Sequence, residues 1–200
     1  MLQLPIVSQA QLNIPVVQRR GRPRRFMNPG EPEVLLSLVA SVTPSCMVEI
    51  GVNEGGTAQE LLQGVPSIQK YIGVDVPPGY KFTCKVQRNE APRNPGCLVR
   101  DRSRFRLVLR PNGSRDLFPS DFPKGAVDVF FIDGDHSRQA VIHDTILARS
   151  VVRPGGLIIW HDYHDMSTVD VRDVLHMFHK SGEEIVHVEN TWLAYQHVES

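Results

Sequence analysis

MVEIGVNEGGTAQELLQ, residues 47–63, is the stretch of sequence that decides the fold. Residues 47–51 form a short apolar run that ends in glycine, which predicts a strand. The residues after the glycine-rich turn are helix formers, and Ala58, Leu61 and Leu62 fall on one side of the helix that they predict. A strand, a glycine turn and a helix therefore follow one another, which is the repeating unit of an α/β domain.

The same alternation continues outward in both directions. The run VDVFFID, residues 127–133, is almost uninterruptedly apolar, as expected for a central parallel strand buried on both faces. The segments EIVHV and TWLAYQHV predict a terminal antiparallel pair joined at Glu189-Asn190. Further strands are predicted at residues 70–75, 105–110 and 157–160, and helices at residues 31–42, 137–151 and 171–178. We therefore expect an α/β fold of the Rossmann-like kind, with a doubly wound, mostly parallel sheet and a terminal antiparallel strand pair.

Composition bounds the number of domains and the class of partner. Two hundred residues with 41% hydrophobic content are enough for one domain, expected over residues 31–200, after a loosely packed basic arm over residues 1–30. Lys+Arg and Asp+Glu balance at 22 each, so the whole chain has no bias toward nucleic acid or an anionic membrane. Three cysteines without a CxxC pair favour a reducing compartment, and the N-terminus lacks the pattern of a signal peptide. A cytoplasmic location without membrane association is the default expectation.

The arm carries a motif of its own. Residues Arg19–Arg25, RRGRPRR, contain RGRP, the core of the AT-hook, which lays arginines along the narrow minor groove of DNA. This match supports nucleic-acid binding as a second class of function, but four-residue matches arise easily in arginine-rich sequence. A solvated arm, or a contact between copies of the chain in a homo-oligomer, explains the same residues without it.

Residues 78–104 are the least regular part of the chain. Proline, glycine, arginine and asparagine are scattered through them with little periodicity. A long loop of this kind inside a compact domain is usually a binding loop or disordered. In folds of this class, loops and added segments determine which acceptor is bound. Here those segments are the arm and residues 78–104, whose structure the sequence does not predict, so the substrate cannot be identified from the sequence.

In a doubly wound sheet, ligands bind outside the carboxyl ends of the strands, so residues that follow each strand are candidates for a site. The first strand precedes a turn that contains Gly51, Asn53 and Gly55, where glycine lets a ligand approach the backbone closely. Asp75 ends the second strand, where a carboxylate can accept hydrogen bonds from ribose hydroxyls. An ordinary α/β turn explains these residues equally well. Glu49 favours a cofactor, because a carboxylate beside the turn suits a cationic cofactor better than a pyrophosphate.

The chain resembles a known family in four segments. VEIGVNEGGTA, the acid in YIGVD, FFIDGDHS and RPGGLIIWHDY together resemble the class I S-adenosylmethionine-dependent methyltransferases. They look most like the small-molecule O-methyltransferase branch that includes macrocin O-methyltransferase and its metal-dependent relatives, and the likeness covers residues 31–197. The resemblance implies that S-adenosylmethionine is the cofactor. The residues that it places around this cofactor are Glu49, Gly51, Asn53 and Gly55 along the methionine and ribose, Asp75 on the ribose, Gly113 and Ser114 near the adenine, and Asp133 beside them.

Asp133, His161 and Asp162 follow neighbouring strands of the predicted sheet, so their side chains are expected to converge on one point. Such a set suits Mg²⁺ or another divalent cation, with substrate oxygens completing the coordination. In the metal-dependent relatives that the chain resembles, the position of His161 is usually a carboxylate, so a softer metal is one alternative. A hydrogen-bonded polar cluster without a metal is the other.

His136 follows Asp133 by three residues, and its counterpart in the family that the chain resembles is the general base. Imidazole titrates near neutral pH and can take the proton of a substrate hydroxyl. Asp133 and His136 are therefore the catalytic candidates. The alternative for His136 is a polar residue at a helix N-terminus, paired with Asp135. His164 follows the HDY turn closely enough to face the same cleft.

The function expected from these residues is S-adenosylmethionine-dependent O-methyl transfer to a hydroxylated small molecule, assisted by a divalent cation and a histidine base. Two other classes stay open. One is a nucleic-acid-associated methyltransferase or DNA-binding protein that uses the RGRP arm. The other is an NAD-dependent oxidoreductase built on the same kind of sheet.

Overall fold

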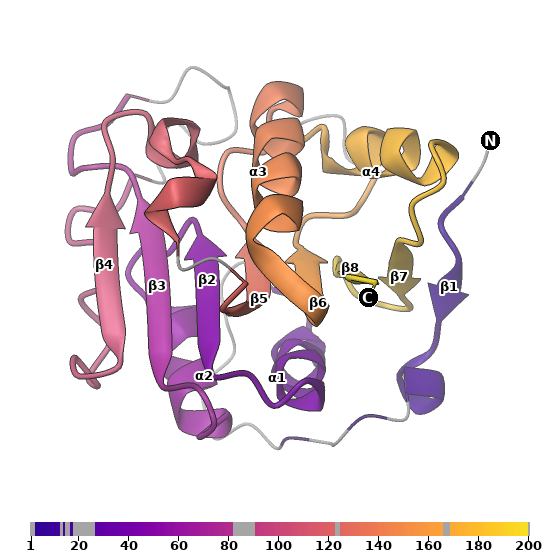
Figure 1. The fold of residues 1–200 in the computed structure, drawn as a ribbon, viewed down its shortest axis with the longest axis horizontal. Helices are drawn as coiled ribbons and strands as arrows, with labels where there is room; N and C mark the ends of the chain where they lie inside the picture. The colour runs from indigo at the N-terminus through magenta and orange to yellow at the C-terminus, as the bar shows by residue number, and fades with distance from the viewer. Residues whose placement is uncertain are drawn as a thin grey trace.

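The strands form one eight-stranded sheet with helices on both sides (Figure 1). The structure, a computed structural model, describes residues 3–12, 14, 17, 27–81, 91–122, 125–165 and 169–199. The strands are β1 Ile6–Val7, β2 Cys46–Ile50, β3 Lys70–Asp75, β4 Phe105–Leu109, β5 Val127–Ile132, β6 Val152–Trp160, β7 Val186–Val188 and β8 Ala194–His197. The α-helices are α1 Glu31–Ser41, α2 Gly56–Gly64, α3 Arg138–Val151 and α4 Val171–Lys180. Three short 3₁₀ helices are η1 Gln9–Leu12, η2 Gly113–Asp116 and η3 Pro119–Asp121.

The order of the strands is β1-β7-β8-β6-β5-β2-β3-β4. Each neighbouring pair from β6 to β4 is parallel, whereas β8 runs antiparallel to both of its neighbours, β6 and β7. The predicted Rossmann-like sheet with a terminal antiparallel pair is therefore confirmed.

Helices cover both faces of the sheet, α3 and α4 on one and α1 and α2 on the other (Figure 1). Successive side chains of a strand point to opposite faces, so β5 contributes to two cores. Phe130 packs in the core that also holds residues of α3 and α4, and Phe131 packs in the core that holds residues of α1 and α2. Burial on both faces explains why the sequence of β5 is apolar without alternation.

The order in which the chain adds strands to the sheet reverses at β2. From β2 the chain moves outward to β3 and β4, and it then returns to β5 on the other side of β2. In open α/β sheets, ligands bind at the carboxyl ends of the strands where such a reversal occurs. The loops that follow β2 and β5 therefore flank the expected ligand site.

The N-terminal segment is more closely packed than the predicted loose arm. Ile6 and Val7 pair in parallel with β7 as an added edge strand, and the side chain of Leu4 is buried in the core. A strand of two residues has too little pattern to be recognised in the sequence. The basic motif Arg19–Arg25 lies outside the described residues, and the domain boundary at residue 31 stays a prediction.

The second half of the irregular stretch 78–104 packs against the glycine turn after β2. The backbone N–H of Gly96 donates to the carbonyl of Asn53, and that of Leu98 donates to the carbonyl of Glu54, both at 2.8 Å. Residues 91–104 thus form an ordered cover over this turn, while residues 82–90 lie outside the described residues. Among the helices of the described chain, none has the length and apolar character needed to cross a bilayer.

Candidate active site

The turn after β2 is shaped by a close approach of two strand ends. Gly51 has a φ of +86°, and a Cβ atom at this position would lie 1.9 Å from the backbone oxygen of Asp133. Gly55 has a φ of +85°, and a Cβ there would lie 2.7 Å from the side chain of Val99. The two glycines therefore let the loop after β5 and the segment 91–104 pack directly on the turn. In the structure the glycines make room for the protein's own chain, and their role in admitting a ligand stays a prediction.

Asp75, at the end of β3, is hydrogen-bonded to the same turn. Its Oδ2 accepts the backbone N–H of Asn53 at 2.6 Å, and its Oδ1 accepts the N–H of Val76 at 2.7 Å. Burial raises the pKa of Asp75, and the two N–H donors only partly offset that effect. Each carboxylate oxygen has a further lone pair, so Asp75 retains acceptors for the hydroxyls of a ribose.

Glu49 is buried in β2, two residues before Gly51. Its Oε2 accepts a hydrogen bond of 2.8 Å from the hydroxyl of Tyr71, and the residue is 1% exposed. Since a buried carboxylate without such donors is strongly unfavourable, Tyr71 helps to keep this acid inside the sheet. The structure therefore buries this acid two residues before the turn, and its place beside a cationic cofactor stays a prediction.

The 3₁₀ helix η2 closes the other side of the rim. Gly113 lies against Val76, since a Cβ on Gly113 would be 3.2 Å from that side chain, and Ser114 is buried. Arg115 forms an ion pair of 2.8 Å with Asp135 in the loop after β5. The loops that hold the predicted cofactor residues are thus joined in one continuous rim at the carboxyl ends of β2, β3 and β5.

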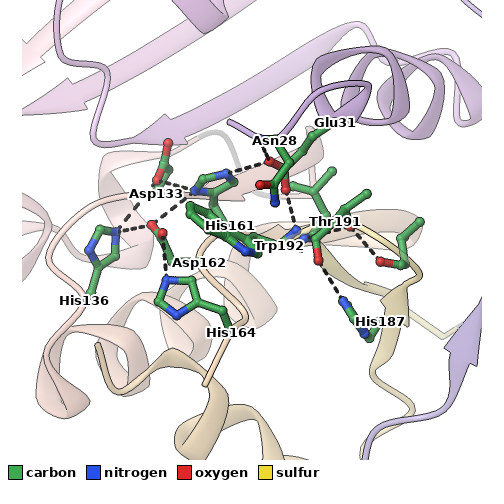
Figure 2. Close-up of polar contacts among 12 residues, drawn as sticks. Asn28, Glu31, Asp133, His136, His161, Asp162, His164, His187, Thr191 and Trp192 are labelled. Atoms are coloured by element: carbon green, nitrogen blue, oxygen red, sulfur yellow. Dashed lines mark hydrogen bonds and ion pairs between the residues drawn. The ribbon is translucent and has the colours of Figure 1, made fainter. Parts of the chain in front are cut away.

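At the end of this rim, two carboxylates and two imidazoles share one cluster (Figure 2). Nδ1 of His161 lies 3.3 Å from Oδ1 of Asp133 and 3.1 Å from Oδ2 of Asp162. Nε2 of His136 lies 3.8 Å and 2.9 Å from the same two oxygens. The predicted convergence of Asp133, His161 and Asp162 is therefore present, and His136 joins it. His164 also faces the cluster, with its Nε2 3.3 Å from Oδ1 of Asp162.

The electrostatics of the cluster are those of mutual ion pairs. Burial alone would lower the pKa of His136, but its bonds to Asp133 and Asp162 outweigh burial and raise the pKa to about 10. The pKa of His161 is raised well above its usual value by the same carboxylates, again against the effect of burial. In turn, the two histidines hold the pKa values of Asp133 and Asp162 below their usual range despite burial. In this cluster the carboxylates therefore favour the protonated imidazoles, and the imidazoles favour the ionised carboxylates.

The donor set fits a divalent cation. Candidate ligand atoms of Asp133, His136 and Asp162 all lie within 4.8 Å of one another. The N···O separations of 3.1 and 3.3 Å at Nδ1 of His161 match neighbouring ligands of one ion, which are roughly 3 Å apart when each bond is about 2.1 Å. Asp133, Asp162 and either histidine could therefore hold such an ion together.

Sequence reasoning missed Glu31 as a member of the site. This residue is completely buried at the start of α1, and its Oε2 lies 3.7 Å from Nε2 of His161 (Figure 2). Acidic residues are common in the first turn of a helix because they complement the helix dipole. Glu31 therefore gave no signal in the sequence that distinguished it from an ordinary helix-start residue.

Comparison with known proteins identifies a family for this chain. A family model described as a methyltransferase domain matches residues 48–163, more than half of the chain. The uncharacterized protein R132 of Acanthamoeba polyphaga mimivirus is 32% identical over 120 residues, which are 59% of this chain and 51% of that protein. The match thus spans about half the length of this relative.

Two solved structures share the fold. Cofactor-bound Rv0187 from MTB is 19% identical, with a TM-score of 0.61 over 89% of this chain and 84% of that chain. The O-methyltransferase TomG of Streptomyces achromogenes, in complex with S-adenosylmethionine, is 15% identical, with a TM-score of 0.60 over 86% of this chain and 81% of that chain. These two structures show that the chain shares their fold, and its family model shows that the chain belongs to the methyltransferase-domain family.

Proposed function

We propose that this chain transfers the methyl group of S-adenosylmethionine to a hydroxyl oxygen of a small molecule. The observation that carries the proposal is the position of the Asp133, His136 and Asp162 cluster at the end of the rim formed by the turn at 51–55, Asp75 and η2. A cofactor on that rim and an acceptor at the cluster would be neighbours. TomG, which shares the fold, is itself an O-methyltransferase.

The proposed cofactor contacts follow from the rim. Asp75 would accept hydrogen bonds from the ribose hydroxyls, and Gly51, Asn53 and Gly55 would line the cofactor with their backbone. Glu49, buried two residues before the turn, would provide negative charge for the sulfonium and the ammonium group of the methionine portion. Gly113 and Ser114 in η2 would lie beside the adenine.

The proposed chemistry needs two things from the protein. The sulfonium is already reactive, so the chain must align the acceptor oxygen behind the methyl carbon and remove the proton of the hydroxyl. His136 is the proposed base, since its side chain is 16% exposed at the outer edge of the cluster, whereas that of His161 is 2% exposed. Transfer moves the methyl from sulfur to oxygen, leaves S-adenosylhomocysteine and places the hydroxyl proton on His136.

Asp133, Asp162 and His161 are the proposed holders of a divalent cation. When bound there, a cation supplies positive charge that stabilises the deprotonated acceptor oxygen and offsets the carboxylates that otherwise keep His136 protonated. Of the two imidazoles, His136 has the more exposed side chain, which is why it is assigned the role of base and His161 that of ligand.

The proposal is tested by incubating the purified chain with methyl-labelled S-adenosylmethionine and a panel of catechols, sugars and hydroxylated macrolides, and separately with DNA and RNA, each with Mg²⁺ and with EDTA. We expect label in at least one hydroxylated acceptor and a large loss of that label with EDTA. Labelled nucleic acid without any labelled small molecule would overturn the choice of acceptor. Full activity in EDTA would overturn the role of the cation.

A further inference from the structure

Glu31 is held rigidly at the start of α1. Its Oε2 accepts the backbone N–H of Asn28 at 2.6 Å, and its Oε1 accepts the backbone N–H of Trp192. The side chain is completely buried. Two backbone donors fix the orientation of this buried carboxylate, because each N–H satisfies one of its oxygens.

His161 stands between this carboxylate and the cluster (Figure 2). Its Nδ1 faces the oxygens of Asp133 and Asp162, and its Nε2 points to Glu31 at 3.7 Å, an ion-pair distance. Nε2 makes no hydrogen bond within the described part of the chain. Phe131 and Trp192 lie edge-on to the ring, with centroids 6.3 and 6.1 Å away, so the imidazole has little freedom to turn.

We propose that Glu31 is a positioning residue that acts through His161: it fixes the ring so that Nδ1 and the oxygens of Asp133 and Asp162 form one preorganised set for a divalent cation. This inference rests on the proposed function. In protein metal sites a ligating histidine commonly gives its second ring N–H to a carboxylate, which fixes both the tautomer and the ring orientation. Glu31 offers that carboxylate from a helix distant in the sequence.

A purely structural explanation of Glu31 accounts for only part of the geometry. The bonds to Asn28 and Trp192 would anchor the start of α1 whether or not a histidine stood at position 161. The direction of Nε2 toward the same carboxylate, opposite to the cluster, is what a positioning role requires. Carboxylates that hydrogen-bond a metal-ligating histidine typically raise metal affinity by roughly 10- to 100-fold.

The test is a double-mutant cycle on Mn²⁺ binding, measured by calorimetry on the full chain. We expect Glu31→Gln to weaken Mn²⁺ binding by about 10- to 100-fold, while binding of S-adenosylhomocysteine changes less than about twofold. In the background of His161→Gln, Glu31→Gln should have little further effect, because the residue that transmits its influence is gone. Glu33→Gln, the same change two positions along α1, is the matched control and should leave Mn²⁺ affinity unaltered.

A second readout does not depend on the variants folding. In ¹⁵N-histidine spectra of the wild-type chain with Mg²⁺, the ring of His161 should carry its proton on Nε2, with the Nδ1 signal shifting as Mg²⁺ is added. A proton on Nδ1 at saturating Mg²⁺ would overturn the proposal. So would additive effects in the cycle, or a wild-type chain that binds no Mn²⁺. In that last case, retained binding of S-adenosylhomocysteine would show that the proposed cofactor site survives the failure of this inference.

Discussion

The backbone oxygen of Asp133 occupies the space that a side chain at Gly51 would need, 1.9 Å from where its Cβ would be. This contact joins the ends of β2 and β5, and it brings the glycine turn and the cluster of Asp133, His136 and Asp162 to the same edge of the sheet. The absence of a side chain at position 51 is therefore a condition of the site.

We predict that Gly51→Ala lowers the free energy of unfolding by about 3 kcal/mol or more, because a left-handed backbone conformation and a displaced β5 loop both oppose it. Urea unfolding measures this loss. Gly79→Ala is the matched control, since Gly79 has a φ of +84° but nothing within 4 Å of its Cβ position. The control should lose only about 1–2 kcal/mol, the backbone contribution. Equal losses would show that the close approach to Asp133 is unimportant.

Asp75 should govern affinity for the cofactor. Asp75→Asn replaces one carboxylate oxygen with an NH₂ group, which cannot accept a hydrogen bond, so the N–H of either Asn53 or Val76 loses its acceptor. The substitution also removes the negative charge that would bind the ribose hydroxyls. Hydrogen bonds to charged groups contribute about 1.5–3 kcal/mol, so we expect S-adenosylhomocysteine to bind roughly 10- to 100-fold more weakly in calorimetry. Asp101→Asn, a half-buried carboxylate in the segment 91–104 that pairs with Arg104, should leave this affinity unchanged. Unaltered affinity in the Asp75 variant would contradict a cofactor on this rim.

The roles of His136 and Asp133 can be separated by comparing turnover with metal binding. A general base contributes about 10²- to 10⁴-fold, so His136→Gln should lower kcat by at least about 100-fold while Mn²⁺ and S-adenosylhomocysteine still bind. Asp133→Asn should abolish both turnover and Mn²⁺ binding. His143→Gln, on α3 and paired with Asp144, is the control for loss of a histidine. If the His136 variant also loses Mn²⁺ binding, His136 is a metal ligand instead of a free base.

Asp128 should make stability depend on pH at the opposite end of the sheet. Its Oδ2 accepts the backbone N–H groups of Ser45 and Cys46, both at 2.7 Å, and its Oδ1 accepts Nε of Arg153. Burial alone would raise the pKa of Asp128, but these donors outweigh burial and hold the pKa below its ordinary value of 3.8. Because the pKa of Asp128 is lower in the folded chain than in the unfolded chain, the ionised carboxylate stabilises the fold at any pH above the unfolded pKa. This stabilisation is lost as the pH falls through the pKa of the folded chain.

We therefore expect Asp128→Asn to cost about 2–4 kcal/mol at pH 7, with the difference from wild type constant above about pH 5 and shrinking below about pH 4. Urea unfolding at a series of pH values measures it. A difference that grows on acidification would contradict the assignment. Asp173→Asn, in the first turn of α4, serves as a control at an acid that makes none of these contacts.

Much of the fold could be predicted because a strand that is buried on both faces of a sheet has a continuous apolar sequence. The apolar run of β5 and the polar residues that follow it gave both the strand and the position of Asp133. The pair β7 and β8 was likewise predicted and confirmed. β1 could not be predicted, since two residues at a sheet edge carry no periodicity.

The candidate site was predictable only where adjacent strand ends determine which residues meet. Asp133 and Asp162 end neighbouring parallel strands, so topology alone brings them together. Glu31 reaches His161 from a helix on one face of the sheet, and local patterns in a single sequence do not record contacts between positions so far apart. The packing of Gly51 against the loop after β5 could not be predicted either. In a sequence, a glycine that makes room for a ligand cannot be told from a glycine that makes room for a neighbouring loop.

The central claim is that the turn at 51–55, Asp75 and η2 enclose the nucleoside of S-adenosylmethionine. Calorimetric titration of the full chain with S-adenosylhomocysteine tests it most directly. The predicted result is saturable binding of one molecule per chain, weakened by Asp75→Asn and unaffected by Asp101→Asn. An absence of binding to S-adenosylhomocysteine, together with saturable binding of NAD, would contradict it.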